Sequence, residues 1–232
     1  MNPTSRRFFR IALALGTALG LSACASINSV DSNAYFDAVT RAAPINTPLN
    51  ASPEATAPAP ILQAFKVVAV NVTVPNTLRV SEANRYYPGG DIVWREDPIG
   101  NRYEQVKAIV TAGLSDGVTA FTGDREVVLD VVVTRFHALT EKARYTTGGV
   151  HAIQFDIRIT DVATGAVLME PRRIKADFDA LGGNAAVAAE ARGITQKVRI
   201  TEQLAFVIRQ ELGRPEGYSE RANGLIGALN QL

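Results

Sequence analysis

Few side chains in this sequence have the types and the spacing that catalysis or metal binding requires. The candidates are the single cysteine Cys24, the two histidines His137 and His151, and the adjacent acids Glu96 and Asp97. A thiol is a nucleophile, an imidazole moves protons or binds a metal ion, and paired carboxylates serve as acid and base. Neither a Gly-x-Ser-x-Gly elbow on a strand-to-helix turn nor a phosphate-binding glycine loop with its lysine is present. The sequence therefore identifies no reaction, and we expect neither a cofactor nor a metal ion.

Cys24 lies directly after an export signal. Three arginines precede the apolar run 11–23, which is shorter than the roughly 20 apolar residues that a membrane-spanning helix needs. The residues Leu21-Ser22-Ala23-Cys24 resemble the bacterial lipobox, in which small residues precede a cysteine modified with diacylglycerol. This resemblance implies that residues 1–23 are a lipoprotein signal peptide and that the mature chain starts at Cys24. An ordinary signal peptide followed by a chance cysteine is the alternative.

Such an anchor would hold the protein on a membrane surface. A lipobox cysteine usually carries two or three acyl chains, such as palmitate, and each buried CH2 contributes about 0.8 kcal/mol, so attachment through Cys24 would be permanent. Ala25 stands where an aspartate retains enterobacterial lipoproteins in the inner membrane, so we expect the periplasmic face of the outer membrane. The outer leaflet of the inner membrane is the alternative. The residues Ser5-Arg6-Arg7-Phe8-Phe9 look like the twin-arginine export motif, and the general secretory route is the other candidate.

The composition is that of an ordinary globular protein. Apolar residues make up 47% and charged residues 20% of the 232 residues, and the formal net charge is +1. A charge so close to zero gives no reason to expect a nucleic-acid partner. With a single cysteine no intrachain disulfide can form, so the fold must depend on its hydrophobic core.

The chain divides into a tether, one domain and a tail. Prolines between Pro44 and Pro60 stand among Ala, Thr, Ser and Asn residues, which is typical of an extended linker that buries little apolar surface. We expect a lipidated N-terminus and tether over residues 24–63, a single domain over 64–214 and a C-terminal tail over 215–232.

Alternating and helical spacings predict the elements of the domain. Stretches rich in β-branched residues predict strands, and stretches with apolar residues at helical spacing predict helices. In chain order these are strand 65–74, helix 103–120, strand 127–136, strand 153–160, strand 167–178 and helix 194–212. Because consecutive strands joined by tight turns are antiparallel, we predict an α+β fold with one antiparallel sheet of about four strands and both helices on one face.

Several features together resemble a known class of envelope protein. The lipobox, the proline-rich tether and the strand-helix-strand-strand-strand-helix order look like the auxiliary lipoproteins of ABC-type lipid transport systems and several uncharacterised lipoprotein families. The segment Asp91–Pro98 is similar to the stretch in which such domains place a tryptophan just before their first helix. The resemblance implies an uncharacterised alphaproteobacterial envelope lipoprotein.

Trp94 is the residue that we single out as a contact for a partner. Tryptophan is enriched in binding hot spots, and this single Trp lies in an irregular segment. The alternative is that Trp94 fills one end of the core. Glu96 and Asp97 precede the first predicted helix, where the helix dipole favours carboxylates, so we expect a structural role for both.

The two histidines are expected to lie far apart. If Thr147-Gly148 forms the centre of a hairpin, His137 and His151 are separated along the strands by on the order of 20 Å, at about 3.3 Å per residue. They would then be unable to share a metal ion, and each is expected on a strand face.

These observations favour a non-enzymatic lipoprotein that binds another envelope component, as a scaffold or as an auxiliary module of a transport or envelope-assembly complex. Its partners would be the membrane, through Cys24, and an envelope protein. The alternative is a carrier that holds a lipid or a small apolar molecule between sheet and helices, and an enzyme ranks third. A pocket of roughly 300 Å3 or more lined by Val, Ile and Phe would support the carrier, whereas a filled core with an exposed patch around Trp94 would support the binding module.

Overall fold

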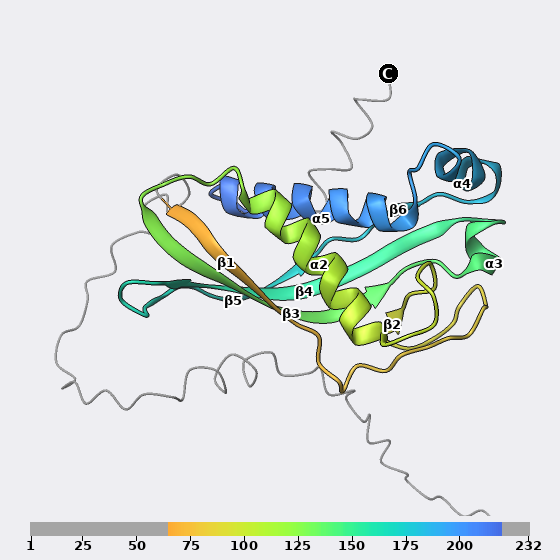
Figure 1. The fold of residues 1–232 in the computed structure, drawn as a ribbon, viewed down its shortest axis with the longest axis horizontal. Coiled ribbons are helices and arrows are strands. Elements are labelled where there is room, and N and C mark those ends of the chain that lie inside the picture. Colours follow the sequence, from red (N-terminus) through yellow and green to blue (C-terminus); the bar gives the residue numbers. More distant parts are fainter. Residues whose placement is uncertain (1–64, 220–232) are drawn as a thin grey trace, which may run out of the picture.

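The computed structural model describes residues 65–219 of the chain (Figure 1). In chain order the elements are β1 (Phe65–Thr73), β2 (Ile92–Val93), α2 (Arg102–Val118), β3 (Arg125–His137), α3 (Glu141–Arg144), β4 (Gly149–Asp161), β5 (Val167–Lys175), β6 (Phe178–Ala180), α4 (Gly183–Glu190) and α5 (Gln196–Gly213). No helix in the described range is long and apolar enough to cross a bilayer.

The strands form a mixed sheet rather than the antiparallel sheet predicted from the sequence. The order is β1-β3-β4-β5, with β2 beside β3 and β6 beside β4. The β3–β4 and β4–β5 pairs are antiparallel as predicted, but β1 and β2 both run parallel to β3. The connection explains the error, because α2 lies between β1 and β3 and a strand-helix-strand unit returns the chain in the same direction. The α+β class is confirmed, and the all-antiparallel arrangement is wrong.

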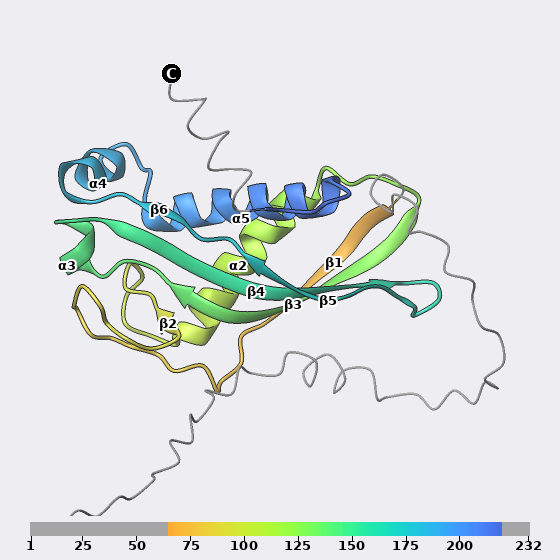
Figure 2. The ribbon, with the colours of Figure 1, turned by 180° about the vertical axis from the view of Figure 1, so that it is seen from behind.

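The helices α2 and α5 pack against each other on the sheet. In Figure 1 α2 crosses in front of the strands, and in Figure 2, seen from behind, the strands hide part of it. Alternate residues of β3 and β4 join the apolar stripes of both helices in one buried core. Its fully buried members include Phe136, Phe155, Leu114 and Leu204. Burying a large apolar side chain stabilises the folded state by about 1.5–3 kcal/mol, so this core dominates the stability of the domain.

Two glycines allow the close approach of α2 and α5. A Cβ atom at Gly117 would lie 2.4 Å from the backbone oxygen of Ala205, and one at Gly113 would lie 2.8 Å from that of Thr201. The stretch 113–117, Gly-Leu-Ser-Asp-Gly, has the letters of a serine-hydrolase elbow, but it lies in the middle of α2 rather than on a strand-to-helix turn. These residues therefore serve helix packing.

The structure also contains four short elements that the sequence does not predict. β2 and β6 have two and three residues, α3 has four, and α4 has eight in an alanine-rich stretch before α5. Elements this short show no measurable periodicity. One of them, α3, shapes the candidate site because it separates β3 from β4.

Candidate functional site

Trp94 lies in the core of the domain and has no exposed surface. Its indole N–H donates a hydrogen bond to Oδ2 of Asp97 over 2.8 Å, and its ring meets that of Phe136 edge to face with centroids 5.8 Å apart. This is the position described by the alternative interpretation, in which Trp94 fills one end of the core. Its role as a partner contact stays a prediction, and Cys24 lies outside the described residues.

Glu96 and Asp97 hold a helix terminus, but not the one that the sequence suggests. The Glu96 carboxylate accepts hydrogen bonds from the backbone N–H groups of Gln196 (2.9 Å) and Lys197 (3.2 Å), which begin α5. It also forms an ion pair with Arg144 at 3.0 Å. Burial would raise the pKa of Asp97, but hydrogen bonds from Lys197 and Trp94 outweigh it and lower that pKa. The expected structural role is therefore right, but the acids stabilise α5, which lies far along the chain.

The two histidines lie on neighbouring positions of β3 and β4, so the predicted separation of about 20 Å is wrong. His137 pairs with Ala152, the neighbour of His151, because α3 lengthens the connection that was expected to be a hairpin turn. Successive side chains on a strand point to opposite faces, so His137 and His151 lie on opposite faces of the sheet. His151 packs against the ring of Phe178 with centroids 4.9 Å apart. Among residues 65–219 no three His, Cys, Asp or Glu side chains are grouped as metal ligands.

Both imidazoles are neutral near pH 7. Burial, helped by the charge of Arg135, lowers the pKa of His137 to about 4. Burial lowers the pKa of His151 to about 3, again with help from a cation, Arg199. Neither ring is therefore poised to exchange protons at neutral pH.

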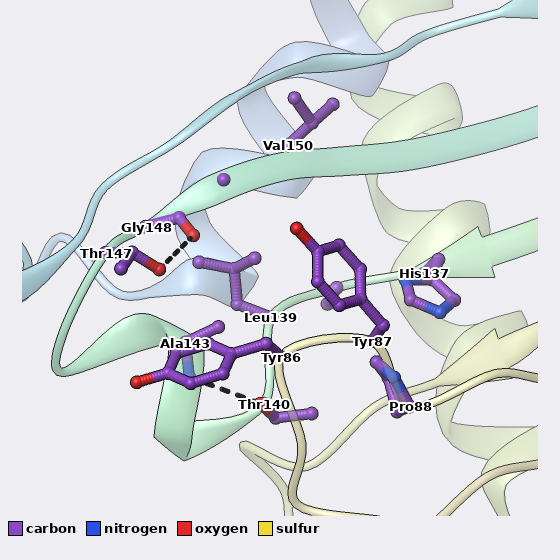
Figure 3. A pocket seen from close by; sticks show the side chains of 12 residues that line it. Tyr86, Tyr87, Pro88, His137, Leu139, Thr140, Ala143, Thr147, Gly148 and Val150 are labelled. Carbon is purple, nitrogen blue, oxygen red and sulfur yellow. Dashed lines mark hydrogen bonds between the residues drawn. The ribbon is translucent and has the colours of Figure 1, made fainter.

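A groove opens where β3 and β4 separate (Figure 3). Its volume is about 630 Å3, within the range of roughly 300–1,000 Å3 that is usual for ligand sites. We call it the fork groove and define it by its lining residues: Tyr86, Tyr87, Pro88, His137, Ala138, Leu139, Thr140, Ala143, Thr147, Gly148, Gly149 and Val150. It is built from the loop before β2, the end of β3, α3 and the start of β4.

The backbone of β4 presents polar groups to this groove. The N–H and C=O groups of Ile153 bond to Asp177 and Ala176, on the β5 and β6 side of β4. Backbone groups of successive strand residues point to alternate sides, so those of Ala152 and Val150 point toward β3. Ala152 is paired with β3, and Val150 is the next residue of β4 whose backbone groups point to that side.

Gln196 prevents β3 from pairing with Val150. The last pair of the β3–β4 ladder is His137 with Ala152, so Leu139 would be the next partner for Val150. The backbone N–H of Leu139 instead donates to the side-chain oxygen of Gln196 (3.1 Å), and its C=O accepts from the side-chain nitrogen (3.5 Å). Because Leu139 bonds to α5, the N–H and C=O of Val150 face the fork groove without a β3 partner.

Two adjacent tyrosines stand at the groove. The side chain of Tyr87 is 93% exposed and that of Tyr86 is 43% exposed. In Figure 3 the Tyr87 ring lies between Leu139 and His137. The ammonium group of Lys142 lies 4.8 Å from the centre of the Tyr86 ring, which is within cation–π range. Two aromatic rings therefore stand together at one groove, and aromatic residues are enriched at binding hot spots.

The loop that carries the tyrosines is tied to the domain by side-chain hydrogen bonds. The Ser81 hydroxyl donates to the carbonyl of Pro88 over 2.9 Å. The Thr140 hydroxyl donates to the carbonyl of Arg85 over 2.8 Å and also caps α3. The exposed rings are therefore presented by an ordered backbone.

Sequence reasoning missed this groove. It gave no weight to the two adjacent aromatic residues that stand before Pro88-Gly89-Gly90. A pair of adjacent tyrosines inside a turn, where a core position is improbable, is the signal that would have drawn attention to it. No local signal reveals the other wall, because that wall depends on the register of β3 and β4.

A second, smaller groove of about 390 Å3 lies between α2 and α5. Its lining residues are Asp97, Glu104, Gln105, Ala108, Ile109, Ala112, Lys197 and Thr201. It lies between the two helices, and the fork groove lies at the end of β3 and β4, so neither is the pocket between sheet and helices that a carrier was expected to have. The patch expected around Trp94 is also not exposed.

Comparisons with known proteins give a family and a distant likeness in fold. No curated protein matches the chain. A candidate lipoprotein from Caulobacter crescentus CB15 is 18% identical with a TM-score of 0.30, over 46% of this chain and 80% of that one. The protein XCC0632 from Xanthomonas campestris, of family DUF330, is 12% identical with a TM-score of 0.38, over 75% of this chain and 93% of that one.

A PelC dodecamer from Paraburkholderia phytofirmans is 16% identical with a TM-score of 0.27, over 65% of this chain and 94% of that one. Likeness at this level does not establish a shared function. A family model covers most of the chain, at residues 65–228. The chain therefore belongs to the family described as "Family of unknown function (DUF6778)".

Proposed function

We propose that this protein is a non-enzymatic envelope lipoprotein whose domain binds another envelope component in the fork groove. The observation that carries the proposal is that two adjacent aromatic residues, Tyr86 and the 93% exposed Tyr87, line a groove of about 630 Å3. Aromatic side chains are enriched at binding hot spots because they bury a large area at little conformational cost. Leu139 and Ala143 supply an apolar lining, and the neutral ring of His137 adds no charge.

The anchor belongs to the same proposal. The lipobox-like residues before Cys24 support attachment through acyl chains, and Ala25 supports the periplasmic face of the outer membrane. The tether joins the domain at Phe65, and Figure 1 places the start of β1 and the α3 end of the domain at opposite ends. The fork groove therefore lies at the end of the domain away from Phe65. A protein of this kind would act as an auxiliary module of a transport or envelope-assembly complex.

Site-specific photocross-linking of the full-length, lipidated chain in native envelopes tests the proposal. A photoreactive phenylalanine analogue replaces Tyr87 in one variant and Ile99 in a matched control. Ile99 is also 93% exposed and lies in the same irregular stretch, but it is not part of the groove. We expect a discrete cross-linked product from position 87 that position 99 does not give. Equal labelling at both positions would overturn the binding function.

The anchor needs a separate control. A Cys24→Ala variant is expected to lose acyl mass and to leave the membrane fraction, while position 87 still cross-links to a purified, detergent-solubilised partner. Retention of both acyl mass and membrane attachment in that variant would contradict the anchor.

The carrier remains the second candidate because of the size of the fork groove. A volume of about 630 Å3 is enough for a small apolar ligand. The cross-linked product separates the two functions, since a product with the mass of a lipid would favour the carrier and a product with a protein would favour the binding module.

A further inference from the structure

The fork groove offers backbone hydrogen-bonding groups as well as an apolar lining. The N–H and C=O of Val150 point toward β3, while Leu139, their natural partner, bonds to Gln196. A backbone N–H and C=O that point into a groove are complementary to an amide of another polypeptide. Neither a lipid chain nor an apolar small molecule would satisfy both groups.

We propose that an extended polypeptide segment of a partner protein occupies the fork groove and adds to the sheet beside β4, with its backbone bonded to Val150. This inference rests on the proposed function and names the chemistry of the partner. In strand addition, main-chain hydrogen bonds provide affinity and pockets for alternate side chains provide specificity. Leu139, Ala143 and the Tyr86 ring would receive an apolar side chain of the segment, and Tyr87 would close over it.

Charges on the rim indicate which segments fit best. Arg85, Arg135 and Lys142 form no ion pair with a described residue. The nearby acids that form no ion pair with a described residue are Asp91, near His137, and Asp179, which lies opposite Val150, whereas Glu141 of α3 pairs with Arg95. Three cations against two acids leave a positive excess, so the preferred segment carries an acidic residue beside its apolar one.

Selection from a phage-displayed library of random peptides supplies a probe. The full-length protein in detergent is the target, and peptides are kept only if they bind wild type and the Ile99→Ala variant but not Tyr87→Ala. We expect peptides that combine acidic and apolar residues. Peptides that depend on Tyr87 but carry no acidic residue would overturn the charge preference alone.

Hydrogen exchange at Val150 tests strand addition directly. In the free protein the Val150 amide should exchange faster than that of His151, which points toward β6. A selected peptide should slow exchange at Val150 by at least about tenfold, the loss expected from one hydrogen bond. Protection of Val150 in the free protein, or no change with bound peptide, would overturn the inference.

A backbone variant gives an independent measurement. Val150→Pro removes the N–H that faces the groove, and Val150→Ala keeps it while shortening the side chain. We expect Val150→Pro to weaken peptide binding by about tenfold more than Val150→Ala does. Hydrogen exchange on the wild type decides the question if Val150→Pro fails to fold. If position 87 cross-links to a glycan or a lipid, strand addition fails while the binding function stands.

Discussion

Two aromatic residues that lie close together in the chain, Tyr87 and Trp94, differ completely in their exposure to solvent. Trp94 has no exposed surface, whereas Tyr87, which lies shortly before it in the chain, is 93% exposed. The sequence singled out Trp94, as a partner contact or as a plug at one end of the core, and the structure buries Trp94 and exposes Tyr87. The difference teaches that the type of an aromatic residue does not decide its role. What decides it is whether the tertiary structure offers the ring a cavity and a partner for its polar edge.

The register of β2 produces this difference. Val93 pairs with His137 in a parallel bridge, which carries the next residue, Trp94, into the core beside Phe136. Asp97 accepts the indole N–H there, so the ring buries no unpaired donor. Tyr87 lies before β2, on a loop that remains outside the sheet.

The largest effect should come from removing the buried ring. Trp94→Ala is expected to lower the free energy of unfolding by about 3–5 kcal/mol, because a core cavity replaces a large side chain. Denaturant unfolding followed by circular dichroism measures it, and Trp94→Phe is the conservative control with a smaller loss. A loss no greater than that of Tyr87→Ala would contradict the assignment of Trp94 to the core.

Next in size is the support of the Trp94 segment by Glu96. Glu96→Ala leaves the amides of Gln196 and Lys197 without their acceptor and removes one of the two carboxylates paired with Arg144, the other being Glu190. We expect a loss of about 1–3 kcal/mol in the free energy of unfolding, and a smaller loss for Glu96→Gln, which keeps an acceptor. Faster hydrogen exchange at the start of α5 should accompany it, and unchanged exchange there would argue against the capping role.

The two histidines extend the comparison to pH. The pKa of His151 is lowered from 6.5 to about 3, first by burial and then by the charges of Arg199 and Arg144. Because the unfolded chain binds this proton more readily, stability falls as pH drops below about 6.5, by at most about 1.4 kcal/mol per pH unit. His151→Leu should flatten this dependence between pH 6.5 and about 3.

The free energy of unfolding also falls at low pH through acidic groups with lowered pKa values, such as Asp97 and Glu141. They remain in the His151→Leu variant, so only the difference between variant and wild type reports on His151. His137→Leu should flatten the dependence over the narrower range from pH 6.5 to about 4, because burial also lowers the pKa of His137. Equal slopes for His151→Leu and wild type would show that His151 is not buried as a neutral ring.

The smallest effect on stability belongs to the exposed segment. Tyr87→Ala is expected to change the free energy of unfolding by no more than about 0.5 kcal/mol, as at other surface positions. Its effect on binding should be large, because removal of a hot-spot aromatic residue costs at least about 2 kcal/mol of affinity. Denaturant unfolding checks the effect on stability, and binding of the partner protein identified by cross-linking, measured beside Ile99→Ala, checks the effect on affinity. A destabilised Tyr87→Ala protein would assign the ring to packing.

Local patterns predicted the parts of the fold that depend on nearby residues. The antiparallel β3–β4–β5 arrangement and the helices α2 and α5 follow from alternation, hairpin turns and helical spacing. The direction of β1 was wrong because it depends on how α2 crosses back over the sheet. The histidine positions were wrong because α3 was invisible in the sequence and changed the register.

The candidate site was less predictable than the fold. Glu96 and Asp97 were correctly expected to have a structural role, yet only the folded chain shows that their partner is α5. The fork groove has no sequence motif. Gln196, far along the chain, bonds to Leu139, so Leu139 does not pair with Val150 and the groove stays open between them.

By itself the sequence determined the class of fold, the dependence on a core without disulfides, and the prediction of a lipid anchor at Cys24. Each of these depends on composition or on residues close together in the chain. Only the tertiary structure decided that Trp94 is buried, that β1 is parallel to β3, and that Val150 faces an open groove. Those outcomes depend on contacts between distant segments, where register and packing select one arrangement among several that local preferences allow.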